Sequence, residues 1–367
     1  MNRVLMVHQG AELYGSDRSF LSIAKYFDET YTGDIEVILP EKGELSESFN
    51  KSGIHPTYHG LGILRKKDVK KIFRFLLDSI KSVFFYRSKY KSFDIVYINT
   101  VVMFSALIAA ALTKNKRVIC HVREIPVGKQ MFVFKLLLKL SRAHLIFNSE
   151  ATKNAFGFKG DVIYNGVEAP SNPTEIPSTI KASKINFLII GRVNDWKGQD
   201  LLLESIAKLT PEVRSKIKVR VVGGTFGGNN TVLTHLFKLI EENNLKEVVQ
   251  FHNFSNDPSE HYDWAHWVVV PSKKPEPFGR VAVESFAFGK PVIAANHGGL
   301  REIVTDKKNG FLFEPNSISS LMNIINLVLH MPSDEYSRLA EASKNEYLNR
   351  FSEQSYQQHL YNLILVK

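Results

Sequence analysis

Cysteine is almost absent from this chain of 367 residues: Cys120 is the only one, so no disulfide can form within the chain. A reducing compartment is the simplest setting for such a composition. The first apolar run, Val4–Val7, is typical of a β-strand and far too short for the core of a secretory signal. We therefore expect a cytoplasmic protein that is not secreted.

Long apolar runs are also missing. The longest one, Val101–Leu112, is shorter than the roughly 20 residues that a helix needs to cross a bilayer, and it predicts a buried helix instead. Several catalytic signatures are absent as well. The chain has no His-Glu-X-X-His, Gly-X-Ser-X-Gly, phosphate-loop lysine or Gly-X-Gly-X-X-Gly motif. These absences argue against a zinc protease, a serine hydrolase, a P-loop enzyme and a dinucleotide-dependent dehydrogenase.

The composition is that of a globular, basic protein. Hydrophobic residues make up 44% of the chain, and its length suits two domains that each have a core. Lys and Arg number 47 against 37 Asp and Glu, which gives a net charge of +10. This charge favours an anionic partner, which could be a nucleotide, a nucleic acid or a phospholipid surface.

Short β-rich runs alternate with helical patterns in both halves of the chain. The predicted strands are Val4–Val7, Ile35–Leu39, Ile95–Ile98, Arg117–Val122, His144–Phe147, Val162–Tyr164, Asn186–Ile190, Val219–Val222, Val248–Phe251, Trp267–Val270 and Pro291–Ala294. Helical patterns in the second half cover Asp200–Leu209, Leu233–Asn243 and Ile318–His330. Such alternation predicts α/β structure with parallel sheets covered on both faces, that is, two Rossmann-like domains.

The most informative segment is 275–302. Glu276 stands in a Pro-Glu-Pro-Phe-Gly turn, and Glu284 follows after seven intervening residues. The apolar run 266–271 before the turn predicts a strand, and a helical pattern begins at about Arg280. Ligands of open α/β sheets bind at such strand ends, where a helix N-terminus offers N–H groups to phosphate. Two carboxylates there can accept the hydroxyl protons of a sugar or a ribose.

Either glutamate alone would be typical of a solvated charge. The pair, however, comes with further motif residues, which are Pro277, Phe278, Gly279, Gly289, Pro291, Gly298, Gly299 and Glu302. The whole segment resembles the donor-site signature of the retaining glycosyltransferases of family 4, the group 1 glycosyltransferases with the GT-B fold. The resemblance implies that Glu276 binds the sugar and Glu284 the ribose, and that Pro277, Phe278, Gly279 and Arg280 line the donor site. Arg280 stands where the family often has an apolar residue, which leaves its role open.

A pair of cations lies on the loop between two predicted elements. Gly191 and Arg192 follow one strand, and Lys197 precedes the next helix. The planar fork of Arg and the compact charge of Lys can together neutralise a diphosphate, although either alone is more typical of a surface charge. The spacing is similar to the phosphate-binding pair of the family. This similarity implies that Gly191, Arg192 and Lys197 hold the leaving group.

The loop after the first strand, Gly10–Ser19, leads into a helical pattern from about Ser19. It resembles the N-terminal glycine loop of the family, in which two small residues let the backbone approach the donor phosphate. Gly15 and Ser16 occupy those positions, with Ser16 in place of the second glycine. The resemblance implies donor contacts for both and an acceptor contact for Tyr14. Read alone, the segment is an ordinary turn between a strand and a helix.

Three residues close a strand of the first half. His121, Arg123 and Glu124 stand at the end of the run Arg117–Val122. Family members commonly keep a histidine here near the transferred sugar, so the resemblance implies a catalytic role for His121 as a hydrogen-bond partner of a sugar hydroxyl or of the acceptor. Arg123 and Glu124 are candidates for acceptor contacts. A histidine at a strand end is otherwise mostly structural.

The positive charge of the first half gathers in two amphipathic segments, Arg65–Lys91 and Lys129–Arg142. Both mix Lys and Arg with Phe, Leu and Ile. Such helices can lie on an anionic membrane with their apolar side chains in the headgroup region. Core-packed helices with solvated basic backs are the alternative, and a nucleic-acid surface is a competitor without a recognisable module. We expect contact with the inner face of the cytoplasmic membrane and no nucleic acid.

The resemblance implies a GT-B fold with two Rossmann-like domains whose parallel sheets face a central cleft. We expect an acceptor-binding domain at 1–168, a proline-rich linker at 169–183 and a nucleotide-sugar-binding domain at 184–350. The tail at about 351–367 is expected to pack back on the first domain. The sequence has no Asp-X-Asp motif, so we expect no metal and no cofactor.

The expected reaction is retaining transfer of a hexose or deoxyhexose from a nucleoside diphosphate sugar to an acceptor hydroxyl. A lipid-linked oligosaccharide of a bacterial surface polysaccharide, such as O-antigen or capsule, is the expected acceptor. The alternatives are a soluble acceptor, or a non-catalytic nucleotide- or nucleic-acid-binding protein of the same fold.

Overall fold

The computed structural model of the chain describes residues 3–13, 15–60, 72–113, 117–171, 184–225 and 231–366, without the side chains of 72–76 and 366. The chain divides into two compact units, and each is treated by itself. The first comprises Met1–Gly166 and Glu353–Lys367, and the second Val167–Ser352. The predicted linker at 169–183 belongs to the second unit, and most of it lies outside the described residues.

The first unit is built around a parallel sheet that has seven strands within the described residues. Its strands are β1 (Val4–His8), β2 (Ile35–Leu39), β3 (Thr57–Tyr58), β4 (Ile95–Asn99), β5 (Arg117–Val122), β6 (His144–Phe147) and β7 (Asp161–Val162). They lie in the order β3-β2-β1-β4-β5-β6-β7, so β1 pairs with both β2 and β4. The direction of chain progression therefore reverses between β1 and β4, where open α/β sheets bind their ligands.

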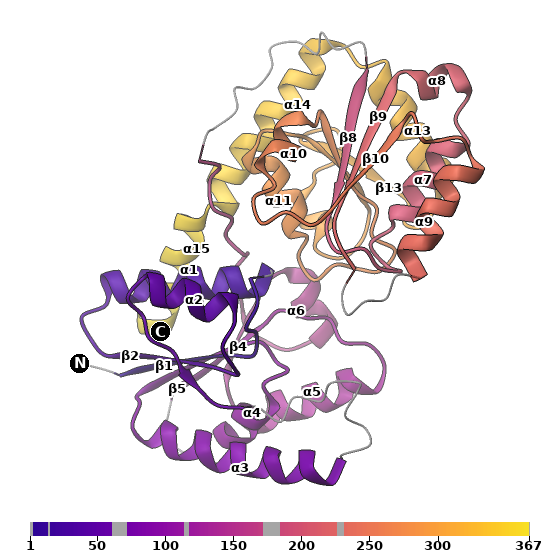
Figure 1. The fold of residues 1–367 in the computed structure, drawn as a ribbon. Helices are drawn as coiled ribbons and strands as arrows, with labels where there is room; N and C mark the ends of the chain where they lie inside the picture. The colour runs from indigo at the N-terminus through magenta and orange to yellow at the C-terminus, as the bar shows by residue number, and fades with distance from the viewer. Residues whose placement is uncertain are drawn as a thin grey trace. The chain divides into compact units, whose positions relative to one another are not determined.

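Helices cover both faces of this sheet (Figure 1). They are α1 (Gly15–Thr30), α2 (Glu44–Lys51), α3 (Ile72–Lys91), α4 (Phe104–Ala111), α5 (Lys129–Ser141), α6 (Glu150–Phe156) and, from the C-terminus, α15 (Glu353–Val366). One core joins alternate residues of β1 to α1, α2 and α15. Another joins the remaining residues of β1 to α3, α4 and α5. Burial on both faces explains why these strands read as continuous apolar runs.

The second unit repeats this plan with six described strands in the order β10-β9-β8-β11-β12-β13. Its strands are β8 (Ile185–Ile190), β9 (Ile217–Val222), β10 (Val249–His252), β11 (Trp267–Val270), β12 (Val292–Ala295) and β13 (Gly310–Phe313). Its helices are α7 (Gln199–Ala207), α8 (Pro211–Ser215), α9 (Thr231–Glu242), α10 (Ser259–Trp264), α11 (Arg280–Ala287), α12 (Leu300–Ile303), α13 (Ile318–Leu329) and α14 (Ser333–Glu346), followed by the π-helical turn η2 (Tyr347–Phe351). Here β8 pairs with both β9 and β11, so the reversal falls between β8 and β11.

Two Rossmann-like units with parallel sheets are thus confirmed, with corrections of detail. Helix α1 begins at Gly15 and not at Ser19, because Asp17 in its first turn complements the positive end of the helix dipole. The apolar run at 101–112 becomes a helix only from Phe104 to Ala111. The short strands β3 and β13 were not predicted. Among the described residues, no helix combines the length and the apolar character that crossing a membrane requires.

Candidate functional site

In the second unit, two loops meet at the carboxyl ends of β8 and β11. The first loop follows β8 and leads to α7, and the second follows β11 and leads to α11. The N–H of Lys273 donates to the carbonyl of Trp196 across them, at 2.7 Å. Gly198 has a φ of +80°, and a Cβ there would lie 1.9 Å from the carbonyl oxygen of Pro271. Only glycine permits this close approach of the two loops.

The approach brings the two predicted residues Lys197 and Glu276 together. Lys197 Nζ lies 2.7 Å from Glu276 Oε1, with 19% of the lysine and 8% of the glutamate side chain exposed. The N–H groups of Trp196 and Lys197 both donate to the side chain of Asn194, which fixes the turn before the lysine. A cation and an acceptor therefore face each other in a largely dry site.

Glu276 is charged despite its burial. Burial alone would raise the pKa of its carboxyl, but the ion pair with Lys197, the hydrogen bond from Ser272 and the nearby His297 together hold this pKa below its usual value. His297 in turn donates through Nε2 to the carbonyl of Ser272, at 2.7 Å. The carboxylate is thus an acceptor held by several donors.

The backbone of Glu276 is fixed by the glycine pair of the motif. The N–H of Gly299 donates to the carbonyl of Glu276, at 2.8 Å. A Cβ on Gly298 would lie 2.5 Å from that carbonyl oxygen, and one on Gly299 would lie 2.4 Å from the carbonyl oxygen of Phe278. The backbone of Glu276 and Phe278 therefore packs directly against Gly298 and Gly299, and a side chain at either glycine would clash with it.

Helix α11 carries the second carboxylate of the motif. It begins after Gly279, whose φ is +112°. Arg280 Nε donates to Glu284 Oε1 at 2.8 Å, and the hydroxyl of Tyr262 donates to Oε2 at 2.9 Å. Phe278 is buried and packs edge-on against Phe351. The start of α11 therefore combines helix N–H groups, a guanidinium and an oriented carboxylate.

The remaining predicted donor residues of this unit lie on the loop after β8. Gly191 has a φ of +139°, and the side chain of Arg192 is exposed. Gln199 donates from its side chain to the carbonyl of Arg192, at 3.2 Å. The structure thus pairs Lys197 with Glu276 and Arg280 with Glu284. The side chain of Arg192 lies on the surface of the loop that carries Lys197.

In the first unit, a buried polar network lies at the carboxyl ends of β1, β4 and β5. His8 Nε2 lies 2.6 Å from Asp17 Oδ1, and Asn99 Nδ2 lies 2.9 Å from His8 Nδ1. Ser16 donates to Asp17, at 3.3 Å. Gly15 and Ser16 form the first turn of α1 instead of a loop, and Tyr14 lies outside the described residues.

His121 belongs to the same network. Its Nδ1 lies 2.8 Å from the hydroxyl of Tyr97 and 3.2 Å from Arg123 Nη2. Because a guanidinium only donates, Nδ1 is an acceptor, and the neutral ring carries its proton on Nε2. Burial and the charge of Arg123 lower the pKa of His121 well below its usual value. Nε2 is buried and has no hydrogen-bond partner among the described residues.

Arg123 is the centre of this network. Its guanidinium donates to Asn99 at 2.6 Å, to the hydroxyl of Tyr356 at 2.9 Å, and to Asn165. Tyr356 comes from the C-terminal helix α15, and Asn165 precedes the point where the chain leaves this unit. All these partners are neutral groups. Arg123 is therefore a buried structural cation and does not project into solvent as an acceptor contact would.

Glu124 accepts a hydrogen bond from the side chain of Thr100. Burial raises the pKa of Glu124, against the hydrogen bonds from Thr100 and the backbone that lower it. Thr100 has a φ of +111°, which a β-branched residue adopts only under strain. Such a conformation persists only where the surrounding structure holds the residue in place.

Several members of these clusters carry no motif in the sequence. They are Tyr97, Asn99 and Tyr356 in the first unit, and Tyr262 and Ser272 in the second. Asn99 and Ser272 stand at or near the end of a predicted strand, which is their only sequence signal.

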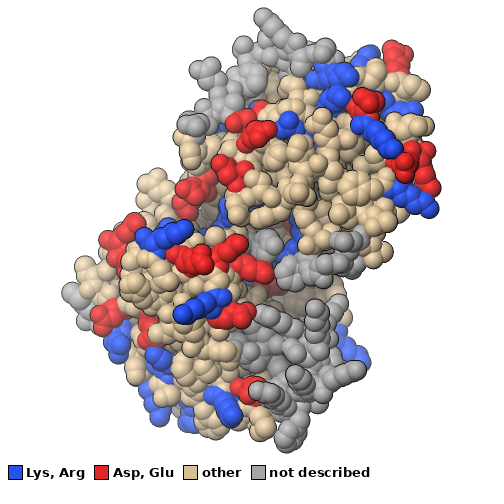
Figure 2. Space-filling view, viewed as in Figure 1, with Lys and Arg blue, Asp and Glu red and all other residues tan. Residues whose placement is uncertain are grey.

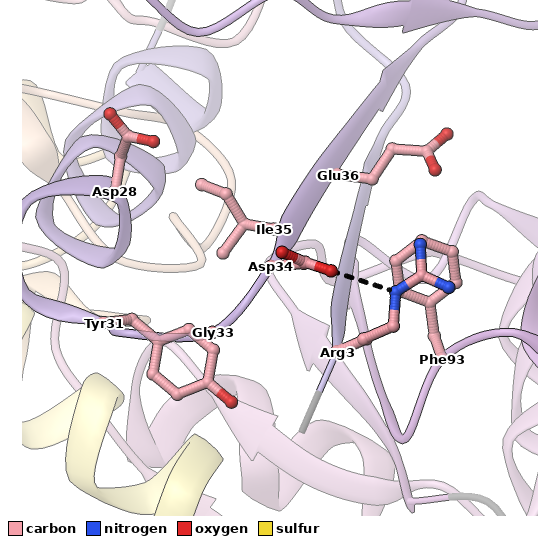
Figure 3. A pocket seen from close by; sticks show the side chains of 8 residues that line it. All are labelled: Arg3, Asp28, Tyr31, Gly33, Asp34, Ile35, Glu36 and Phe93. Carbon is pink, nitrogen blue, oxygen red and sulfur yellow. Dashed lines mark ion pairs between the residues drawn. The ribbon is translucent and has the colours of Figure 1, made fainter. Parts of the chain in front are cut away.

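A separate pocket lies at the opposite edge of the first sheet, where β1 and β2 begin (Figure 3). Arg3 stacks on Phe93 at 4.7 Å and pairs with Asp34 at 3.4 Å. Asp28 and Glu36 also line it. The pocket lies at the other end of the strands from the network of His121. Its cation, Arg3, is already in contact with Phe93 and Asp34. Within the described residues, no group of three or more His, Cys, Asp and Glu side chains could hold a metal ion.

The two units, each built on a parallel sheet, have the architecture of the GT-B class. Residues 173–346 match the sequence model of the family "Glycosyl transferases group 1". This match confirms the resemblance to group 1 glycosyltransferases that the motifs indicated.

The chain is 32% identical over 206 residues to a D-inositol 3-phosphate glycosyltransferase of Frankia alni, covering 52% of this chain and 48% of that protein. It is 34% identical over 179 residues to a lipopolysaccharide 1,2-N-acetylglucosaminetransferase of Salmonella typhimurium, covering 45% and 44%. The chain thus spans about half the length of the curated relatives it matches.

Among solved structures, Anabaena Alr3699/HepE in complex with UDP and glucose is similar over the whole of both chains, with a TM-score of 0.81 and 24% identity. The apo form of the lipopolysaccharide outer core galactosyltransferase WaaB is similar with a TM-score of 0.75 and 16% identity, over 99% of both chains. At these identities the likeness shows the fold alone, and it confirms the GT-B class.

Proposed function

We propose that this protein is a retaining glycosyltransferase of family 4 that moves a hexose or deoxyhexose from a nucleoside diphosphate sugar to an acceptor hydroxyl. The observation that carries the proposal is the pairing of Lys197 with Glu276 beside the start of α11, since it places a phosphate-binding cation next to a hydroxyl-binding carboxylate. The family match of residues 173–346 and the UDP and glucose in the complex of Anabaena HepE support it.

In the proposed mechanism, the bond between the anomeric carbon and the β-phosphate oxygen breaks, and the acceptor oxygen bonds to the same face of the sugar. The proton of the acceptor hydroxyl passes to the departing diphosphate, so no protein nucleophile is needed. Lys197 and Arg192 stabilise the negative charge that develops on the leaving group, and the N-terminus of α11 adds its dipole. No metal is required for this charge stabilisation.

The two carboxylates bind hydroxyl groups of the donor. Glu276 accepts from the transferred sugar and Glu284 from the ribose. Sugar binding offers Glu276 new donors in place of the Lys197 ammonium, which is then released to the diphosphate. In the first unit, His121 Nε2–H is the unsatisfied donor that a sugar or acceptor hydroxyl would meet.

Donor binding can be tested by heat-shift measurements with UDP-, GDP-, dTDP- and ADP-sugars in the absence of metal. We expect one of them to stabilise the wild type and to be slowly hydrolysed. The Glu276→Ala and Arg192→Ala variants should lose hydrolysis. Binding without hydrolysis would favour the alternative, a non-catalytic protein of the same fold that binds nucleotide or nucleic acid. Absence of binding by every nucleotide sugar would contradict the proposed donor site.

The acceptor is proposed to be a lipid-linked oligosaccharide of a surface polysaccharide, O-antigen or capsule, at the inner face of the cytoplasmic membrane. Helix α5 exposes a stripe of apolar side chains, of which Phe132 is 71% exposed and Leu140 55%. Lys139 and Arg142 are exposed beside them. Helix α3 adds Phe84, which is 62% exposed. The cations at 65–71 lie outside the described residues.

This combination suits an anionic lipid surface, because the apolar stripe can enter the headgroup region while the cations meet lipid phosphates. Figure 2 shows basic and acidic side chains interspersed among the described residues of the visible face. The lipopolysaccharide transferase of Salmonella typhimurium among the relatives agrees with this acceptor class.

Membrane contact can be tested by sedimentation with phosphatidylglycerol vesicles. Phe132→Ser together with Leu140→Ser should reduce binding by at least about tenfold, because each apolar side chain contributes up to about 1.5–3 kcal/mol when it is fully buried. Leu327→Ser on α13 of the second unit is the matched control, since Leu327 is 50% exposed. Equal binding by all variants, or none by the wild type, would favour the soluble acceptor, which the similarity to D-inositol 3-phosphate glycosyltransferases keeps as the second candidate.

A further inference from the structure

The carboxylate of Glu284 is held at both of its oxygens. Arg280 Nε donates to Oε1, and the hydroxyl of Tyr262 donates to Oε2. Tyr262 is completely buried and stacks on Phe288, with the ring centroids 4.9 Å apart and an angle of 16° between the planes. One donor is therefore anchored in the core and the other on the same helix, one turn earlier. The carboxyl plane has little freedom to rotate.

Helix stability does not explain the presence of Arg280. It is the first residue of α11, where a cation is repelled by the positive end of the helix dipole. Its pair with Glu284 also runs in the unfavourable direction, because the acidic residue is better placed N-terminal to the basic one. A residue that breaks two local rules together is expected where function requires it.

The carboxylate has capacity left for a ligand. An ionised carboxyl offers about four acceptor sites, of which Arg280 and Tyr262 use one on each oxygen. The side chains of Arg280 and Glu284 are 19% and 22% exposed, so a ligand can approach the pair. Two oxygens with one open site each, in a fixed plane, match the two neighbouring hydroxyl groups of a ribose.

We propose that Arg280 is a positioning residue that, together with Tyr262, orients Glu284 toward both hydroxyls of the nucleotide ribose and makes the site selective for ribonucleotides over 2′-deoxyribonucleotides. This inference rests on the proposed donor site. A 2′-deoxy nucleotide leaves one oriented acceptor unpaired, and a site built to hydrogen-bond a hydroxyl rejects the analogue that lacks it. The alternative role for Arg280 is a direct contact with the diphosphate, which would serve both kinds of nucleotide equally.

The test is calorimetric titration of the full chain with UDP and 2′-deoxy-UDP. The wild type should prefer UDP by about tenfold or more, since an unpaired acceptor costs about 1–3 kcal/mol. Arg280→Leu should weaken UDP binding about tenfold and 2′-deoxy-UDP binding less than about twofold, so the preference collapses. Tyr262→Phe should reduce the preference in the same selective way. Arg280→Lys keeps the charge but loses the planar fork and should restore the preference only in part.

Lys238→Leu is the matched control. It removes a cation that also pairs at i,i+4, with Glu242 on α9, in a solvent-exposed position, and it should change neither affinity. Equal loss of both nucleotides in Arg280→Leu would overturn the inference in favour of a diphosphate contact, and no loss would overturn it outright. A wild type that prefers dTDP would also overturn it. If the wild type binds ADP or GDP but not UDP, the ribose and deoxyribose forms of that nucleotide give the same test. Absence of any nucleotide binding is a different result, because it removes the donor site and the inference with it.

Discussion

Replacing Lys197 by methionine tests the physical basis of the donor site in the absence of any substrate. The variant keeps most of the side-chain volume and removes the charge 2.7 Å from Glu276, which is only 8% exposed. Removing one partner of a buried ion pair costs about 3–5 kcal/mol. Because Ser272 still donates to the carboxylate and Lys197 has some contact with water, we expect the lower end, about 3 kcal/mol. This loss corresponds to a fall of about 6 °C in the melting temperature of the second unit, measured by calorimetry.

The same substitution should change how the stability of the fold depends on pH. In the wild type the folded-state pKa of Glu276 is lowered, so the pair stabilises the fold above the unfolded pKa and is lost as pH falls through the folded value. In Lys197→Met burial acts without the ammonium and should raise the pKa of Glu276. The deficit should therefore shrink between pH 7.5 and pH 5, as the buried carboxyl takes up a proton.

Adding Glu276→Gln to Lys197→Met should recover most of the lost stability, because no charge is then left buried. The exposed pair of Lys238 and Glu242 is the control, and Lys238→Met should change stability by less than about 0.5 kcal/mol. A Lys197→Met protein as stable as the wild type at pH 7.5, or a deficit that does not change with pH, would refute the reasoning.

Four further outcomes are expected. Gly198→Ala should cost about 3 kcal/mol or more in urea denaturation, because it combines a φ of +80° with a clash against Pro271, and a midpoint like that of the wild type would contradict the loop geometry. Thr100→Gly should be more stable than Thr100→Ala by about 1–2 kcal/mol, the reverse of the usual order, because only glycine relieves a φ of +111°; the two denaturation midpoints decide this. Arg123→Met should raise the pKa of His121 toward its usual value in an NMR titration, since the guanidinium charge helps to lower it, and an unchanged titration would mean that burial alone sets it. Finally, chelation of divalent metals should leave the rate of sugar transfer unchanged, and loss of transfer restored by Mg²⁺ would contradict the proposed mechanism.

The residues of the proposed donor site could be grouped from the sequence because most of them are close in the chain. Glu276, Glu284 and the glycine pair Gly298 and Gly299 belong to one strand-loop-helix unit, and local spacing is what a motif records. The two parallel sheets could also be predicted, because the alternation of strands and helices is likewise a local pattern in the sequence. What spacing could not show is that Lys197 would reach Glu276, which depends on the packing of Gly198 against Pro271.

The network around His121 shows why the other half was harder to predict. His8, Asn99 and His121 come from three strands, while Arg123 is held by Asn165 and by Tyr356 of the C-terminal helix. No window of sequence contains them together, and a lone histidine at a strand end is usually structural. The sequence made Arg123 a candidate for an acceptor contact, and it could not show that the guanidinium is buried and donates to His121.

Arg123 is held from both places where the chain passes between the first unit and the second. Asn165 lies immediately before the chain passes into the second unit, and Tyr356 lies soon after it returns. Val167 and Ser352, where these two passages meet, are bridged to each other within the second unit. A change in either passage would therefore act on the guanidinium that polarises His121, without any contact between the passages and a substrate. Tyr356→Phe, which removes one hydroxyl and keeps the packing of α15, should lower kcat more than it raises KM for the donor; a change confined to KM would mean that Tyr356 only supports the fold.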